Sequence, residues 1–481
     1  MKYNHIRKPG RIGVFAVAHA KYWEQFDGLR DRLMEYHGDL CEKIRANGTE
    51  VVDFGMVDSN TIAYDLIPQI NAANVDIMFC NMVTYATSSV FAPILREVNA
   101  PMVLVALQPL AALDYTQANT RIQLENDNIC SVPEFTGVAI RMGKKVQDVI
   151  IGRLYGDEQA DRELAEWCSV ADALHALKGA RMGLMGHVLE SMYDMHADPT
   201  AVSAAFGLHV PLLEPDSLLE LRRQVTEEEI AKKAEEIKQK FDMPDPVSDP
   251  ITVKLTDADL REAACSAVAL EHFVEKNKLT GLAYYYEGLE DSELRTAVTS
   301  LILGNSMLIG DGFPMYGEFD IKTCIAMLIM DRLGIGGSFA ELHPFDFKNN
   351  CILIGHDGPH HIQIAEGKPV VRSLLKYHGK PGHGASIEFK LKEGPITMLG
   401  ITQDGNGRFK FVIGEGESQH GPIPPTGNTN TCAVFQPSTP EFIKRWVMAG
   451  PTHHYALGIG HHADTIKKIA DILGIEAVII R

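Results

Sequence analysis

The sequence predicts an α/β protein in which two domains built on parallel sheets precede a β-rich C-terminal domain. Short apolar runs alternate with amphipathic segments through about the first hundred residues, the same rhythm starts again near residue 180, and short strands parted by Gly and Asn turns fill the chain after about residue 350. A chain of 481 residues exceeds one ordinary core, and about 150 residues per domain suggests roughly three domains. We expect them at 1–177, 178–334 and 335–481.

The N-terminal domain is predicted from four apolar runs that have the character of buried strands. They are R-I-G-V-F-A-V-A from residue 11, V-V-D-F-G-M-V from 51, V-D-I-M-F-C-N-M-V from 75 and P-M-V-L-V-A-L from 101, with a helix expected over 22–47. This order indicates a Rossmann-like or flavodoxin-like parallel sheet with helices on both faces. Ligands of such sheets gather beyond the carboxyl ends of strands. The loop 84–89, which contains Tyr85, is therefore a candidate binding loop.

The central domain is predicted to repeat this strand and helix pattern. It begins with the strand A-R-M-G-L-M-G-H-V at 180–188, which runs into a glycine-containing turn. Helices are expected from Thr226, where the sequence has a capping-box pattern, and over about 257–276. The proline-rich segment 243–250 is predicted to be a loop, and G-L-A-Y-Y-Y-E from residue 281 a buried strand.

The C-terminal domain is predicted to be a small antiparallel barrel or sheet. Its strand-like runs are N-C-I-L-I-G-H-D from residue 350, H-H-I-Q-I-A from 360, A-S-I-E-F-K-L from 385, I-T-M-L-G-I-T from 396 and R-F-K-F-V-I-G from 408. Turns such as Asp-Gly-Asn-Gly at 404–407 separate them, a pattern typical of hairpins. A final helix and strand are expected over 464–480.

Charge and composition exclude several partners. The formal charge of −18, from 63 acids against 45 bases, and the lack of a long Lys/Arg run disfavour nucleic acid and anionic membranes. The apolar run 12–18 ends at His19 and suits a first strand better than a signal peptide, and no stretch reaches the roughly 18 apolar residues of a membrane helix. The eight scattered cysteines contain no C-x-x-C pair, so neither a disulfide framework nor a thiolate zinc site is indicated. We expect a soluble protein of the reducing cytoplasm.

Four side chains toward the C-terminal end are candidate metal ligands: Glu318, Glu341, His356 and His454. Each lies beside glycines or at the end of an apolar element, where a charged group is costly unless it is paired or coordinates something. Two oxygen and two nitrogen ligands suit Mn²⁺, Mg²⁺, Co²⁺ or Zn²⁺. The alternatives are that Glu318 only complements the dipole of a helix starting near Asp320, and that each histidine is an ordinary core or surface residue.

Other catalytic motifs have no support in the chain. The segment 458–463 matches G-x-G-x-x-A, but no clear strand leads into it and too few residues follow for a ribose-binding acid. The sequence contains no Walker A loop, no H-E-x-x-H and no G-x-S-x-G. Nucleotide hydrolysis, zincin proteolysis and serine hydrolysis are therefore unsupported.

The segments around the four candidate ligands resemble those of the L-arabinose isomerases, with a more distant similarity to L-fucose isomerase. G-E-F-D-I-K-T from residue 317 is similar to that family's G-E-G-D-W-K-T, S-F-A-E from 338 to its S-F-M-E, and A-G-P-T-H-H-Y from 449 to its G-G-A-H-H-T, in the same order and approximate spacing. Carried over by position, the resemblance implies metal ligation by Glu318, Glu341, His356 and His454, with His453 beside the substrate.

The resemblance also implies three domains, Mn²⁺ as the usual ion with Mg²⁺ or Co²⁺ as alternatives, and hexamers or trimers with active sites shared between subunits. N-terminal residues near His19, Tyr85 and Cys130 would then help to bind a small-molecule sugar. The chain departs from the family pattern in this pocket: Ala18 stands where the family has Gln, Cys130 where it has His, and Leu189 where Met is usual. Because unpaired buried hydroxyls cost about 1–3 kcal/mol, these changes predict a sugar other than L-arabinose.

The expected function is metal-dependent interconversion of an aldose and a ketose. A divalent ion on O1 and O2 would stabilise an enediol while Glu318 and Glu341 move protons between C1 and C2 and between the oxygens, in an order that the sequence leaves open. A hydride shift would use the same ligands. A non-catalytic sugar-binding or sensor protein, and a metal-dependent epimerase or aldolase acting on a related polyol, are the alternative functions.

Overall fold

The computed structural model describes residues 7–244, 255–289, 291–373 and 384–481. Residues 8–175 form one compact unit, and residues 176–481 together with Arg7 form another. Each unit has hydrophobic cores of its own. A search of the described residues finds no helix both long and apolar enough to cross a membrane.

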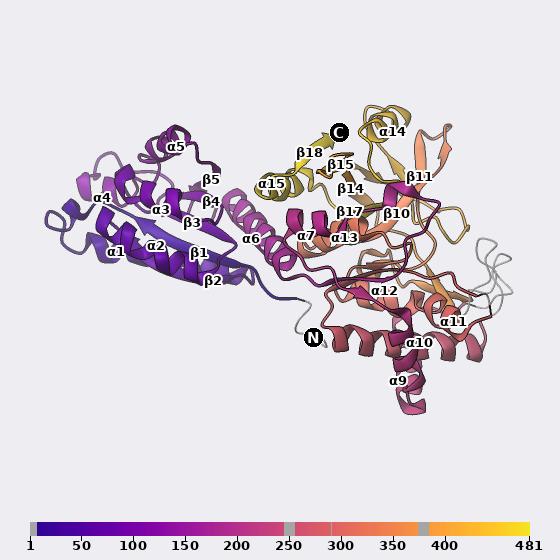
Figure 1. Cartoon of the computed structure of the whole chain (residues 1–481). Coiled ribbons are helices and arrows are strands. Elements are labelled where there is room, and N and C mark those ends of the chain that lie inside the picture. The colour runs from indigo at the N-terminus through magenta and orange to yellow at the C-terminus, as the bar shows by residue number, and fades with distance from the viewer. Residues whose placement is uncertain (1–6, 245–254, 290, 374–383) are drawn as a thin grey trace. The chain divides into compact units, whose positions relative to one another are not determined.

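The first unit contains a five-stranded parallel sheet of order β2-β1-β3-β4-β5, drawn in indigo and purple in Figure 1. All residues of β3 are buried, as is expected for a parallel strand covered on both faces. The order is that of flavodoxin-like sheets. The elements are β1 (Arg11–Val17), α1 (Leu29–Ala46), β2 (Glu50–Val57), α2 (Asn60–Ala73), β3 (Ile77–Met82), α3 (Ala92–Glu97), β4 (Met102–Gln108), α4 (Thr120–Leu124), α5 (Val132–Arg141), β5 (Val146–Arg153) and α6 (Glu158–Gly179).

The second unit begins with a four-stranded parallel sheet of order β7-β6-β8-β9. Both α9 and α10 start with a capping box, at Thr226 as predicted and at Thr256. The elements are β6 (Met182–Gly186), α7 (Pro199–Phe206), β7 (Leu212–Leu213), α8 (Pro215–Arg223), α9 (Glu227–Lys240), α10 (Asp257–Asn277), β8 (Gly281–Tyr285), α11 (Glu293–Thr299), α12 (Ile302–Gly310), β9 (Met315–Tyr316) and α13 (Ile321–Arg332).

A closed antiparallel barrel follows in the same unit. Six strands run in the order β14-β17-β10-β11-β16-β15, β15 pairs back with β14, and β18 adds to β15 in parallel. The predicted fold class is therefore confirmed. The elements are β10 (Gly336–Asp346), β11 (Cys351–Gly355), β12 (Val370–Ser373), β13 (Ala385–Glu388), β14 (Gly394–Gln403), β15 (Phe409–Ser418), β16 (Thr431–Val434), α14 (Thr439–Met448), β17 (Tyr455–Ile459), α15 (Ala463–Leu473) and β18 (Glu476–Ile480).

Several local expectations were wrong. The helix expected from residue 22 begins at Leu29, because Gly28 has a left-handed φ of 72° and starts a new turn. The run 360–365 contains a 3₁₀ helix, Ile362–Ile364, instead of a strand. A strand, β17, does lead into the segment 458–463, although both of its neighbours are antiparallel. A disulfide joins Cys351 and Cys432, which the scattered spacing did not indicate.

Most of the predicted loop 243–250 lies outside the described residues, so that prediction is not tested.

Candidate metal centre

Glu318 lies in a tight turn at the carboxyl end of the central sheet. Strand β9 ends at Tyr316, and Asp320 caps α13 by accepting a hydrogen bond from the N–H of Thr323 at 3.2 Å. Between them, Glu318 and Phe319 have φ values of 62° and 64°, in the left-handed region that non-glycine residues rarely adopt. This turn carries the Glu318 carboxylate past the strand end.

Glu341 lies on strand β10 of the barrel, and His356 directly follows the neighbouring strand β11. Glu341 on β10 is opposite Gly355, the last residue of β11, so His356 follows directly. Oε1 of Glu341 lies 3.9 Å from Nε2 of His356 and 4.0 Å from Nε2 of His343. The antiparallel pairing of β10 and β11 therefore sets this acid beside this imidazole.

His454 reaches the same place from the position just before β17, which pairs with the other edge of β10. Its Nε2 lies 3.4 Å from Oε2 of Glu318. That carboxylate oxygen is buried and has no hydrogen-bond partner among the described residues. A buried, unsatisfied carboxylate oxygen is costly, and a cation between it and the imidazole would offset that cost.

The structure brings the four predicted ligands together. The ligand atoms of Glu318, His356 and His454 lie within 4.8 Å of one another, as do those of Glu341, His453 and His454. The rings of His356 and His454 are 5.1 Å apart between centroids. Two carboxylates and two imidazoles converging from four separate segments fit the donor set of Mn²⁺ or a similar divalent ion.

Asp320 orients His454 from behind and was missed as a functional residue. Nδ1–H of the buried His454 donates to Oδ2 of the fully buried Asp320 at 3.3 Å, which leaves the lone pair on Nε2 facing Glu318. Burial by itself raises the pKa of Asp320, but the hydrogen bond from His454 and the charge of Lys322 outweigh it and lower the pKa to about 2. Burial lowers the pKa of His454, so its ring favours the neutral form that binds metals.

His356 is held in the equivalent tautomer by its own neighbours. Its Nδ1 lies 2.7 Å from the main-chain carbonyl of Asp357, and the hydroxyl of Tyr316 also contacts this nitrogen. The ring of His360 donates to the main-chain carbonyl of His356 at 2.9 Å. Burial lowers the pKa of His360 to about 3, so this ring is neutral at physiological pH. The pattern G-H-D-G-P gave no sign of these partners.

His453 is paired with Asp194, a residue that the sequence did not single out. Oδ2 of Asp194 accepts from Nδ1 of His453 at 2.7 Å and from its main-chain N–H at 2.9 Å. The fully buried Lys322 donates to the main-chain carbonyls of Asp194 and His196, at 2.9 and 3.1 Å. The lysine in G-E-F-D-I-K-T was the available signal, because a lysine amid apolar residues at a helix start needs acceptors.

The remaining predicted sugar residues lie in two units. His19, Tyr85 and Cys130 belong to residues 8–175, where the rings of His19 and Tyr85 are 6.2 Å apart and both meet Tyr22. Cys130 is exposed, yet partial desolvation and the nearby acids Asp127 and Glu134 raise its pKa. Leu189 is half-buried in the loop after β6, in the unit that carries the metal ligands.

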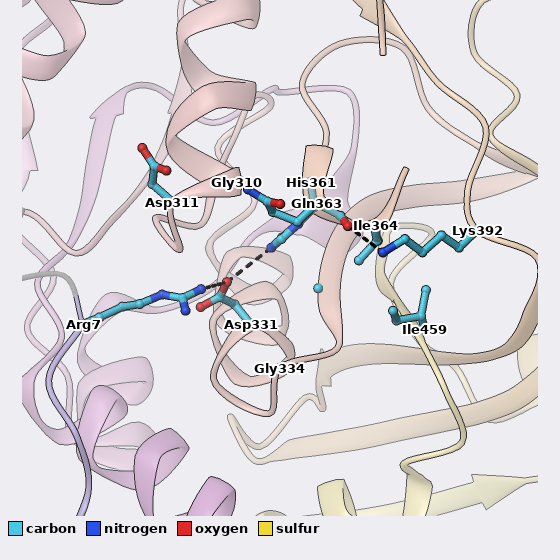
Figure 2. A pocket seen from close by; sticks show the side chains of 11 residues that line it. Arg7, Gly310, Asp311, Asp331, Gly334, His361, Gln363, Ile364, Lys392 and Ile459 are labelled. Atoms are coloured by element: carbon cyan, nitrogen blue, oxygen red, sulfur yellow. Dashed lines mark hydrogen bonds and ion pairs between the residues drawn. The ribbon is translucent and has the colours of Figure 1, made fainter. Parts of the chain in front are cut away.

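Several cavities lie elsewhere in the described part of the second unit, and one of about 820 Å³ is lined by residues of α7, β15 and the turn 403–408. One, of about 470 Å³, is at the far end of α13, where Figure 2 shows Arg7 and His361 both directed at Asp331. Another, of about 460 Å³, lies beyond the carboxyl ends of β6 and β7 and is lined in part by Phe319. None of these three cavities is lined by the four predicted ligands, so none of them is the metal centre.

Comparisons with known proteins point to one family. Residues 336–476 match the L-arabinose isomerase C-terminal domain, and residues 191–336 match the L-arabinose isomerase central domain. An L-arabinose isomerase of Nocardioides sp. is 24% identical over 414 residues, covering 83% of this chain and 79% of that protein. Another, from Shewanella sp., is 21% identical over 473 residues, covering 92% and 91%. One from Aeromonas hydrophila is 22% identical over 406 residues, covering 83% and 79%.

Proposed function

We propose the following function from the premise that this chain belongs to the L-arabinose isomerase family: it is an aldose–ketose isomerase with its active centre at Glu318, Glu341, His356 and His454. The convergence of these four side chains carries the proposal. They come from positions up to 136 residues apart by number, and their ligand atoms fall within two overlapping groups less than 4.8 Å across.

Glu318, Glu341, His356 and His454 would hold one divalent ion, Mn²⁺ in the first instance. When bound, such an ion polarises the carbonyl and hydroxyl oxygens of a sugar and stabilises the negative charge that develops on them. The residues behind the ligands support this role. Asp320 and Asp357 fix the two imidazoles with Nε2 toward the centre, and neighbours of this kind commonly change metal affinity 10–100-fold.

The two glutamates are the proposed catalytic residues. One takes the proton from the sugar carbon and the other moves a proton between the oxygens, and each such transfer contributes on the order of 10²–10⁴-fold. Among the described residues, Oε2 of Glu318 has no hydrogen bond to break before it accepts a proton. Asp194 holds Nδ1 of His453, which leaves Nε2 as the ring nitrogen that would bind a sugar hydroxyl.

The proposed substrate is an aldose other than L-arabinose, because Ala18, Cys130 and Leu189 replace residues expected to meet hydroxyl groups. Residues His19, Tyr85 and Cys130 would act on the substrate from a neighbouring subunit of a hexamer or trimer. The division into domains 1–177, 178–334 and 335–481 and a cytoplasmic location belong to the same proposal.

The test is ketose formation by the Mn²⁺-loaded protein with a panel of pentoses, hexoses and deoxy sugars that includes L-arabinose. Glu318→Gln and Glu341→Gln should each abolish turnover and leave the fold intact. Glu417→Gln is the matched control, because it removes a half-exposed carboxylate of the same barrel that belongs to neither ligand group. Turnover unchanged by Glu318→Gln or Glu341→Gln would remove that residue from the centre.

Two further outcomes separate the alternatives. Running the reaction in deuterated water should place label in the product, whereas complete absence of label would exclude proton transfer and favour a hydride shift. Metal binding with no turnover of any sugar in the panel would favour a sugar sensor, and epimer or cleavage products would favour an epimerase or aldolase.

A further inference from the structure

A second cluster of metal-binding side chains lies in the first unit, within residues 8–175. His37 and Cys41 are on α1, four residues apart and so on one face of the helix. Asp53 comes from β2 and Asn81 from β3. His37 is fully buried and Cys41 is 1% exposed, whereas the side chain of Asp53 is 40% exposed. The cluster is therefore buried on its helix side and open to water at the carboxylate.

The distances within the cluster are those of neighbouring ligands on one small ion. Nε2 of His37 lies 2.9 Å from Oδ1 of Asp53 and 3.8 Å from Sγ of Cys41, and all three ligand atoms fall within 4.8 Å. Tetrahedral zinc with Zn–N of about 2.05 Å, Zn–O of about 2.0 Å and Zn–S of about 2.3 Å has N–O and N–S edges of roughly 3.3 and 3.6 Å. The observed separations differ from these edges by a few tenths of an ångström.

Asn81 can set the histidine tautomer that ligation requires. Its side-chain amide lies 3.2 Å from Nδ1 of His37. With the amide nitrogen toward the ring, Nδ1 accepts and Nε2–H donates to Asp53, which satisfies the metal-free protein. With the amide rotated by half a turn, its oxygen accepts from Nδ1–H and the lone pair of Nε2 faces Cys41 and Asp53. The same four residues thus suit both the metal-free and the metal-bound state.

We propose that His37, Cys41 and Asp53 form a zinc site in the first unit, with Asn81 as the positioning residue and water from the exposed side of Asp53 as the fourth ligand. One thiolate, one imidazole and one carboxylate are a borderline-soft set that favours Zn²⁺ over Mg²⁺, Ca²⁺ or Mn²⁺. The two negative ligands balance the charge of the ion. The site joins α1 to two strands of the sheet, so zinc stabilises the folded unit.

Binding at this site has a proton signature. Burial and the charge of Asp53 raise the pKa of the Cys41 thiol to about 12, so the thiol is protonated at neutral pH without a metal. The ion forms a bond to sulfur as the S–H bond breaks, and the proton leaves to solvent. Metal uptake should therefore release one proton per ion from this site, and its apparent affinity should rise about tenfold per pH unit near neutrality.

Cobalt titration of the full-length, metal-stripped protein tests the site. Co²⁺ bound to a thiolate shows a near-ultraviolet sulfur-to-metal charge-transfer band, which the Glu318, Glu341, His356 and His454 centre, having no sulfur, does not produce. We expect the band in the natural protein, its loss in Cys41→Ser, and its retention in Glu341→Gln. Cys130→Ser is the matched control, because this exposed thiol is the one that stray metal would reach first.

Asp53→Asn and Asn81→Ala keep the test decisive if Cys41→Ser fails to fold. Each should retain the band and lower the Co²⁺ affinity at least about tenfold, and Zn²⁺ should displace Co²⁺ from the natural protein. No charge-transfer band at saturating Co²⁺, or a band that persists in Cys41→Ser, would overturn the zinc site without bearing on the isomerase function.

Discussion

Replacing Asp320 by Ala should weaken metal binding at the proposed active centre. The carboxylate is fully buried and holds Nδ1–H of His454 at 3.3 Å, which keeps Nε2 free for the ion. Removing a partner of this kind costs about 10–100-fold in affinity, or about 1.4–2.7 kcal/mol. Asp320→Asn should lose less, because an amide oxygen can still accept from Nδ1–H.

The difficulty is that Asp320 also caps α13, and loss of a cap alone costs about 0.5–2 kcal/mol of stability. Asp198→Ala supplies the control, because Asp198 caps α7 through the N–H groups of Thr200 and Ala201 and belongs to no ligand group. Titration calorimetry with Mn²⁺ at pH 7, on protein whose circular dichroism is unchanged, gives the affinities. Asp320→Ala binding within threefold of the natural protein, or an equal loss in Asp198→Ala, would refute the reasoning.

Acid stability extends the same argument. The pKa of Asp320 is about 2 in the folded protein against 3.8 for an ordinary aspartate. A carboxyl group with a depressed pKa stabilises the fold above its unfolded pKa, and this contribution disappears as pH falls through the folded value. The Asp320 carboxylate thus contributes on the order of 2 kcal/mol to the free energy of unfolding, and this contribution is present above about pH 4 and lost toward pH 2. Asp320→Asn should flatten that part of the profile, measured by urea unfolding of the metal-free protein.

Three other predictions concern the same unit. Burial lowers the pKa of His356, but the neighbouring Asp357 outweighs this effect and raises the pKa above the ordinary histidine value of 6.5. Protons therefore compete with the metal for this ring near neutral pH, and Mn²⁺ affinity should increase as the pH rises through this range. An affinity that does not change with pH would argue against an imidazole ligand. Lys322→Met should lower the free energy of unfolding by about 1–3 kcal/mol, because two main-chain carbonyls lose their buried donor. In the control variant Lys467→Met, the exposed ion pair with Asp471 is worth at most about 0.5 kcal/mol. Urea unfolding measures both variants, and equal midpoints would contradict this prediction. Gly355→Ala should weaken Mn²⁺ binding, because an added Cβ would collide with the main chain of Asn428 and Asn430 beside the metal centre. The control Gly405→Ala, in an open turn, should have no effect. Equal affinities by calorimetry would show that the main chain at 428–430 moves aside without disturbing the centre.

The sequence predicted the parts of the fold that depend on periodicity. Continuous apolar runs such as 77–82 are buried on both sides of a parallel sheet, and glycine turns such as 404–407 join barrel strands, so both leave a local pattern. The run 360–365 misled because its histidines face polar partners instead of alternating between core and solvent. Ser338 binds the ring of His360, and Asp331 binds the ring of His361.

The sequence predicted the candidate metal ligands but not the residues that hold them in position. The local sequence was enough to predict the four ligands, because they lie in glycine-rich segments that resemble known motifs: Glu318, Glu341, His356 and His454. Asp194 lies 259 residues from His453, in the 3₁₀ helix Tyr193–Met195, whose sequence has no distinctive pattern. Partners that meet only through the tertiary fold leave no trace in local spacing, and this also applies to the link between Cys41 and Asp53.

Phe319 is a non-glycine residue with a strained, left-handed backbone conformation, and the motif that this segment resembles avoids the strain. The resembling motif has glycine at this position, and a phenylalanine held at φ 64° costs roughly 1–2 kcal/mol more than glycine would. Phe319 lines the cavity beyond β6 and β7 and directly follows Glu318 of the proposed active centre. A laboratory lineage selected only for heat tolerance should revert position 319 to glycine early, whereas one selected for turnover should keep the ring.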